Sequence, residues 1–132
     1  MHDKTSTESQ SALDELGGQW SMVSCTRDGE PVPAGYVKWG KRVANGNEMT
    51  MSMAGKIITK AKFKIDPSRQ PKEIDYAVLE GQGAGQTLYG IYELDGSILK
   101  FCVSGEGQAR PRDFSSGRGS GQTLTIWRLD KR

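Results

Sequence analysis

Alternation of apolar and polar residues with a period of two is the feature that most constrains how this chain folds. In KIITKAKFKID (56–66), three lysines fall on the face opposite to Ala61 and Phe63. EIDYAVL (73–79) repeats the pattern, with Tyr76 among the apolar residues and two carboxylates on the other face. Because successive side chains of a strand point to opposite faces, this pattern predicts half-buried β-strands whose lysines and carboxylates pair across a hairpin.

Turn residues separate about eight such segments, which predicts an all-β antiparallel fold: a meander, a sandwich or a small barrel. Closure into a barrel would remove the exposed edges of a flat sheet. A chain of 132 residues is expected to form one domain. We assign that domain to residues 16–132 and expect residues 1–15 to be a flexible N-terminal segment. SALDELGG (11–18) is expected to form a short helical turn that ends at glycine.

The charge balance gives no reason to expect nucleic acid or a membrane as a partner. The 18 basic and 16 acidic residues leave a formal net charge of +2. No apolar run approaches the roughly 18–20 residues of a membrane-spanning helix. The first residues lack the apolar region of a signal peptide. As written, the chain is expected to be a soluble cytoplasmic monomer, or an exported one if a signal peptide has been removed.

Histidine and cysteine are scarce, and their positions restrict the chemistry. The only histidine is His2, in a terminal segment expected to fray, which argues against Ser-His-Asp catalysis, haem ligation and ordinary zinc sites. We therefore predict no metal and no cofactor. Cys25 and Cys102 are either one disulfide or two thiols, and the sequence leaves both open.

The most regular hairpin is GIYELDGSILKFC (90–102). A two-residue loop at Asp95-Gly96 would pair Tyr92 with Leu99 and send both inward. Cys102 would then point away from the main apolar interior. A shift by one residue would exchange the two faces and bury a glutamate among apolar side chains, so the first register is the better fit.

Gly18-Gln19-Trp20 opens the first strand as a G-x-W pattern, which in lipocalin-type barrels places the indole at one end of the barrel. There a basic residue from the last strand lies against the indole in a cation–π contact. Arg128, in TIWRLDKR (125–132), is placed for that role. The alternative is an ordinary core tryptophan and a surface arginine.

A wider resemblance covers residues 16–132. It rests on the segments LGGQW, RDGEPVP, FKIDPSRQPKEID, GIYELDGSILKFC, RPRDF and WRLDKR. Together they resemble a family of small uncharacterised bacterial lipocalin-like domains of the planctomycete type. The resemblance implies a single antiparallel lipocalin-like (calycin-type) β-barrel of about eight strands. It supplies no catalytic residues, because the family has no established common activity.

Methionine and aromatic residues on the expected inward faces suggest a ligand site. Methionine side chains are pliable and suit adaptable apolar surfaces. Barrels of about eight strands are either filled by side chains or hold one small ligand, so a filled core stays an alternative. The candidate ligand-binding residues are Trp20, Trp39, Met49, Met51, Met53, Phe63, Tyr76, Tyr92, Phe101, Arg110 and Arg128.

Two glycine-rich segments are interpreted as loops. GQGAGQT (81–87) lacks the Lys-Ser/Thr and the helix of a phosphate-binding loop, which favours a flexible hairpin loop. SGEGQARPRDFSSGRGSGQT (104–123) is long enough to be a lid, a binding loop or a solvated segment. Its arginines are suited to a carboxylate or phosphate, and Arg110-Pro111 with Phe114 to anchoring the loop on the barrel.

We expect a non-enzymatic domain that binds a small apolar or amphipathic molecule inside the barrel. One alternative is a protein-interaction module with a filled barrel, anchored on a partner by Phe114, Trp127 and Tyr89. Another is a cofactor-free barrel cyclase or isomerase, with Tyr76, Tyr92 and Arg128 as its polar groups. An enzyme ranks last, because no acid/base pair is visible.

Overall fold

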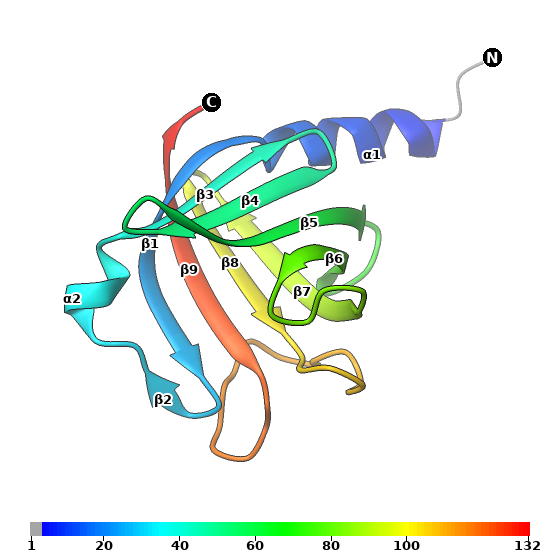
Figure 1. The fold of residues 1–132 in the computed structure, drawn as a ribbon. Coiled ribbons are helices and arrows are strands. Elements are labelled where there is room, and N and C mark those ends of the chain that lie inside the picture. Colours follow the sequence, from blue (N-terminus) through cyan, green and yellow to red (C-terminus); the bar gives the residue numbers. More distant parts are fainter. Residues whose placement is uncertain (1–3) are drawn as a thin grey trace.

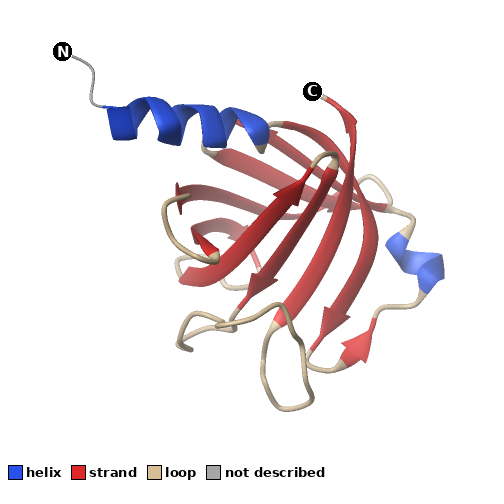
Figure 2. Ribbon diagram, turned by 180° about the vertical axis from the view of Figure 1, so that it is seen from behind, coloured by secondary structure: helices blue, strands red, loops and turns tan. Residues whose placement is uncertain are grey.

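Eight antiparallel strands close into a lipocalin-like β-barrel in the computed structural model of the protein, which describes residues 4–132 (Figures 1 and 2). Each strand pairs with the next from β3 to β9, and β1 closes the barrel by pairing with both β3 and β9. The predicted fold class is confirmed. The elements are α1 (Lys4–Glu15), β1 (Gly18–Arg27), β2 (Glu30–Pro31), α2 (Ala34–Val37), β3 (Gly40–Asn45), β4 (Glu48–Met53), β5 (Lys56–Asp66), β6 (Lys72–Gly81), β7 (Thr87–Asp95), β8 (Ile98–Val103) and β9 (Thr123–Lys131).

The predicted inward faces of β5 and β6 are confirmed at Ala61, Phe63 and Tyr76. Phe63 and Tyr76 face each other across the two strands, and both are buried. On the outer face, Lys64 Nζ lies 3.9 Å from a carboxylate oxygen of Asp75. Such exposed cross-strand pairs contribute about 0.2–1 kcal/mol each, so burial of the inner face dominates the stability of this hairpin.

The β7–β8 hairpin turns at Gly96 and Ser97, one residue later than the sequence suggested. Gly96 has a φ of 60°, which suits the first central position of a two-residue hairpin turn. Tyr92 therefore lies opposite Phe101, so the expected pairing with Leu99 is wrong. The pairing moves by two residues, an even number, and every side chain keeps its predicted face. Tyr92, Leu99 and Phe101 are all buried in the core.

Helix α1 lies at one end of the barrel, beside the C-terminus, while the β8–β9 loop lies at the other end (Figure 1). The helix has 12 residues and is longer than the short turn expected. It delivers Leu16 to the core, where Trp20 Nε1 donates a hydrogen bond to the Leu16 carbonyl at 3.1 Å. Gly18 is required here, because its φ is 118° and a Cβ would lie 2.6 Å from the Lys131 carbonyl oxygen. The flexibility predicted for residues 1–15 stays a prediction, and His2 lies outside the described residues.

The predicted stacking of Arg128 on Trp20 is wrong. In β9 the side chains of Trp127 and Leu129 pack on the core, so Arg128 between them points outward, with 62% of its side chain exposed. Another arginine acts at this end of the barrel instead. Arg132 Nη1 donates to the carbonyls of Asp14, Glu15 and Gly17 at 2.9–3.3 Å. A cation at the carbonyl end of a helix is electrostatically favourable, so Arg132 holds α1 against the barrel.

The cysteines lie on opposite sides of the barrel wall. Both are free and buried, and Cys25 belongs to the inner core. Cys102 points away from that core, as predicted, and its Sγ lies 3.2 Å from the Ser115 carbonyl oxygen of the β8–β9 loop. The sequence left open whether the two cysteines form a disulfide or stay as thiols, and the structure has two thiols.

Neither described helix has the length and apolar character needed to cross a membrane.

Candidate functional site

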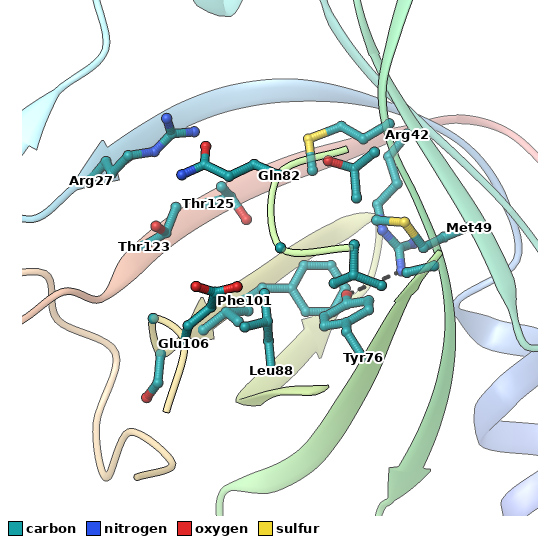
Figure 3. Close-up of a pocket in the computed structure, with 18 of the residues that line it drawn as sticks. Arg27, Arg42, Met49, Tyr76, Gln82, Leu88, Phe101, Glu106, Thr123 and Thr125 are labelled. Atoms are coloured by element: carbon teal, nitrogen blue, oxygen red, sulfur yellow. Dashed lines mark hydrogen bonds between the residues drawn. The ribbon is translucent and has the colours of Figure 1, made fainter. Parts of the chain in front are cut away.

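A cavity of about 390 Å³ occupies the barrel interior and opens at the end opposite α1 (Figure 3). Its mouth lies where β1 ends, β6 turns into β7 and the β8–β9 loop begins. Arg27, Gln82, Glu106 and Thr123 line this mouth. The wall is mainly apolar: its apolar residues are Met49, Met51, Ala61, Val78, Leu88 and Val103, and its polar residues include Thr59, Ser104 and Thr125.

The floor of the cavity is formed by Arg42 on β3, Tyr76 on β6, Phe101 on β8 and Trp127 on β9. Arg42 is 1% exposed. Its guanidinium carbon lies 4.7 Å from the ring centroid of Phe101 and 5.6 Å from that of Phe63. Such cation–π contacts favour the charge and hold the planar group in place.

The guanidinium of Arg42 is largely without hydrogen-bond partners. Its Nη2 donates to the hydroxyl of Tyr76 at 3.4 Å, the contact drawn in Figure 3. Nε and Nη1 are buried without an acceptor, and no carboxylate among the described residues lies within 4.0 Å of the group. A buried charge without a counter-charge costs several kcal/mol, and the aromatic faces offset only part of that cost.

Tyr76 shares this environment. Burial is the main cause that raises the pKa of its hydroxyl above 10, while the charge and hydrogen bond of Arg42 act in the opposite direction. The neutral hydroxyl accepts from Arg42 and keeps its own proton to donate. Arg42 and Tyr76 therefore present hydrogen-bond donors and a positive charge at the bottom of an apolar cavity.

Arg42 is the site residue that the sequence interpretation missed. In GKRVAN (40–45), an apolar-inward assignment would place Val43 inside and Arg42 outside. The structure shows the opposite arrangement: Gly40, Arg42 and Ala44 are buried, whereas Val43 is 48% exposed. The available signal was the phase shared by Arg42 with the small residues Gly40 and Ala44. Such a break of the local pattern is expected at functional sites.

Four of the predicted ligand-binding residues line the cavity: Met49, Met51, Tyr76 and Phe101. Three others are buried in the core without lining it: Trp20, Phe63 and Tyr92. The Tyr92 hydroxyl is buried without a partner, and burial, followed by the charges of Glu15 and Asp66, raises its pKa to about 12. Arg110 and Arg128, which were also predicted to bind the ligand, lie on the outer face of the barrel instead.

The inward placement expected for Trp39 is wrong. Trp39 follows α2, outside the barrel, and is 53% exposed with Lys38 Nζ at 5.3 Å from its ring centroid. Val37 takes the buried position of this connection instead. Met53 is half-buried at the end of β4 and does not line the cavity. Beside it the pairing with β5 shifts, because Met51 lies opposite Thr59 and Ser52 opposite Ile57, which leaves Ile58 of β5 as an extra, bulged residue.

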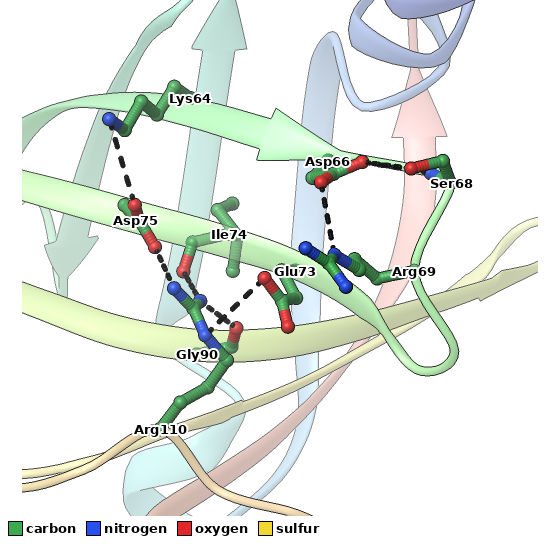
Figure 4. A network of polar contacts seen from close by, with 9 residues as sticks. All are labelled: Lys64, Asp66, Ser68, Arg69, Glu73, Ile74, Asp75, Gly90 and Arg110. Carbon is green, nitrogen blue, oxygen red and sulfur yellow. Dashed lines mark hydrogen bonds and ion pairs between the residues drawn. The ribbon is translucent and has the colours of Figure 1, made fainter.

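Arg110 fastens the β8–β9 loop to the outer wall (Figure 4). Its Nη1 donates to the carbonyls of Ile74 at 3.1 Å and Gly90 at 2.8 Å, and its Nη2 lies 2.6 Å from Asp75 Oδ1. Nε lies 3.6 Å from a carboxylate oxygen of Glu73. The guanidinium is thus occupied by the barrel itself, which matches the anchoring role considered for Arg110-Pro111.

The anchored loop covers the outer face of β7 and β8, where Ile91 and Cys102 are 1% and 0% exposed. Burial raises the pKa of the Cys102 thiol, and burial likewise raises that of Cys25. Raised thiol pKa values mean little thiolate at neutral pH, so both cysteines are poor nucleophiles.

The anchors considered for a protein-interaction module are only partly available. Trp127 is 1% exposed, so its assignment as a surface anchor is wrong. Phe114 is half-buried and lies 5.3 Å from Lys100 Nζ, while Tyr89 lies 5.2 Å from the Arg110 guanidinium. Within residues 4–132, no group of three or more His, Cys, Asp or Glu side chains is placed to hold a metal ion.

Comparison with protein families, curated proteins and solved structures finds no significant match for this chain. Membership of the bacterial lipocalin-like family therefore stays a prediction.

Proposed function

We propose that the protein binds a small apolar or amphipathic molecule inside the barrel. The observation that carries this proposal is the cavity of about 390 Å³ with one open end. Ligand pockets commonly have volumes of about 300–1,000 Å³, and an apolar cavity of about 150 Å³ is enough to bind benzene. The space therefore suits a molecule larger than a single aromatic ring.

The lining supports the same proposal. The apolar wall favours an apolar body, and Met49 and Met51 can adjust their side chains to its shape. A barrel that served only as a protein-interaction module would gain stability by filling this space with side chains, because unfilled volume forfeits packing contacts.

The enzyme alternative lacks a supporting observation. The ionisable side chains that line the cavity are Arg27, Arg42, Tyr76 and Glu106. Glu106 is exposed at the mouth and Tyr76 is buried on the floor, so the two do not form an acid/base pair. A binding function needs no such pair.

Fluorescence titration with a panel of lipids and dyes tests the proposal, because Trp127 lines the cavity and reports on its contents. The decisive variant is Ala61→Leu, which places a larger side chain into the cavity from a wall residue that is 2% exposed. Its matched control is Ala77→Leu, at an exposed position on the neighbouring strand β6.

We expect saturable binding of at least one panel member to the wild-type protein and to Ala77→Leu, and markedly weaker binding to Ala61→Leu. Circular dichroism checks that both variants fold. Absence of saturable binding across the panel, or equal binding by the two variants, contradicts the proposal.

A further inference from the structure

We propose that the ligand of this cavity carries a single carboxylate, which binds Arg42 and Tyr76 on the floor while the apolar body lies along the wall. This inference rests on the proposed function, namely that a small molecule occupies the barrel. It goes further by giving the chemical class of the ligand and its orientation, with the acid group innermost.

The first step concerns hydrogen-bond donors. An arginine side chain has one N–H on Nε and two on Nη1. In Arg42 neither nitrogen has an acceptor, and the residue is 1% exposed. Tyr76 adds its own O–H beside Nη2. Buried donors are almost always satisfied, so this cluster calls for an acceptor that the described residues do not supply.

The second step concerns charge. The guanidinium stays protonated in proteins, and within the described chain it has no carboxylate partner. One buried positive charge is neutralised by one negative charge, which favours a monoanion over a doubly charged phosphate. A carboxylate also matches the planar guanidinium through paired charge-assisted hydrogen bonds.

The third step concerns preorganisation. The rings of Phe63 and Phe101 contact the guanidinium, with centroids 5.6 and 4.7 Å from its carbon. Tyr76 in turn packs against both rings, at centroid distances of 5.9 and 6.2 Å. The donors are therefore fixed before a ligand arrives, and little ordering entropy is lost on binding.

The fourth step concerns the path to the floor. The ionisable groups along the cavity, apart from neutral Tyr76, are two arginines, Arg27 and Arg42, and one carboxylate, Glu106. Their formal sum is one positive charge, which attracts an anion towards the mouth. The wall between mouth and floor is largely apolar. A carboxylic acid with an aliphatic or aromatic body therefore fits, with its body along the wall and its acid group at the floor.

Decanoate and decanamide form the test pair, because they share an alkyl chain and differ in charge. Their affinities are measured by calorimetry and by intrinsic tryptophan fluorescence, to which Trp127 contributes from the cavity, for the wild type, Arg42→Met and Tyr76→Phe. The control is Arg128→Met, which removes the same charge from the exposed outer face of the barrel.

We expect the wild type and Arg128→Met to prefer decanoate by about 10- to 100-fold, the range that a charge-assisted hydrogen-bonded pair supports. Arg42→Met is expected to bind the two probes equally, and Tyr76→Phe to keep part of the preference. Equal binding of the two probes by the wild type, or a preference that survives Arg42→Met, overturns the inference.

A second measurement needs no variant. The Nε–H resonance of Arg42 is followed by NMR in the wild type while benzoate, and in parallel benzamide, is added. A saturable shift with benzoate alone supports the carboxylate site, and no shift overturns it.

The two proposals fail in different ways. If decanamide and the dye panel bind while decanoate shows no advantage, the cavity binds ligands and only the carboxylate inference is wrong. If no apolar probe binds but benzoate moves the Arg42 resonance, the anion site stands and the proposed binding of an apolar body is wrong.

Discussion

Arg42 and Arg110 both lie against the barrel wall with little exposed surface, yet their surroundings are opposite. Arg110, on the outer face, is bound by two carboxylates and two backbone carbonyls. Arg42, on the inner face, has one long hydrogen bond to Tyr76 and two nitrogens without an acceptor.

The same type of side chain fastens a loop at one position and, in the binding that we propose, recognises a ligand at the other. The hydrogen bonds of Arg110 are all made to acceptors of the protein itself. The guanidinium therefore joins the β8–β9 loop to β6 and β7 and stabilises the fold. Arg42 lines the cavity, and its buried Nε and Nη1 have no acceptor, so the residue costs folding energy and, in the binding that we propose, supplies its donors to a ligand.

Arg110→Ala is expected to have the largest effect on stability. It removes charge-assisted hydrogen bonds at a site where 24% of the arginine side chain is exposed. The free energy of unfolding, measured by urea denaturation, should fall by about 2 kcal/mol. Arg112→Ala, an exposed arginine of the same loop, is the control and should leave it unchanged. Equal effects of the two variants would mean that Arg110 does not fasten the loop.

Arg42→Met tests the opposite side of the comparison. Replacing a buried, unpaired charge by an apolar side chain of similar length should raise the free energy of unfolding by about 1–2 kcal/mol without ligand. The measurement is the same urea denaturation. A loss of stability in this variant would show that Arg42 has a structural role like that of Arg110.

Thiol reactivity separates the outer wall from the core. In the wild type both thiols should react slowly with a thiol reagent, because both are buried and burial raises the pKa of each. Arg110→Ala should speed the reaction of Cys102 about tenfold, since loosening a covering loop lowers the cost of local opening. Cys25, inside the barrel, should be unaffected at early times, and mass spectrometry identifies the modified residue. Equal acceleration of both would indicate global unfolding instead.

Tyr92→Phe is expected to have the smallest effect. The variant removes a buried hydroxyl without a partner, so the free energy of unfolding at neutral pH should stay the same or rise by less than about 1 kcal/mol. Tyr92 lies in the core without lining the cavity, so ligand affinity should not change.

The alkaline limb gives a second readout for Tyr92. Its pKa is raised from 10 to about 12 in the folded protein, so the folded state favours the neutral hydroxyl. Below pH 10 the hydroxyl is neutral in both states; as the pH rises from 10 towards 12 it ionises in the unfolded state first, and the free energy of unfolding falls. Tyr92→Phe should therefore lose stability less steeply than the wild type over this range. An unchanged slope would show that Tyr92 ionises as readily in the folded as in the unfolded state.

The alternation in the sequence predicted an all-β antiparallel fold and the inward faces of β6, β7, β8 and of β5 around Phe63, whereas the barrel was expected from the resemblance to lipocalin-like domains. The inward placement of Phe63, Tyr76, Tyr92 and Phe101 follows from that alternation, because a strand commits every second side chain to one face. Even the error in the β7–β8 turn left these faces intact, since it shifted the pairing by two residues.

Tertiary structure decided the features on which the proposed function depends. Closure of β1 on β9 set the interior volume and left the cavity open, and the phase of β3 put Arg42 inside and Val43 outside. The folding back of the β8–β9 loop gave Arg110 its carboxylates, and the contact with α1 gave Arg132 its role. These outcomes depend on groups far apart in the chain, whereas alternation is a local property. The sequence alone therefore determined the strands and their inward faces, but not the cavity or the position of Arg42 inside it.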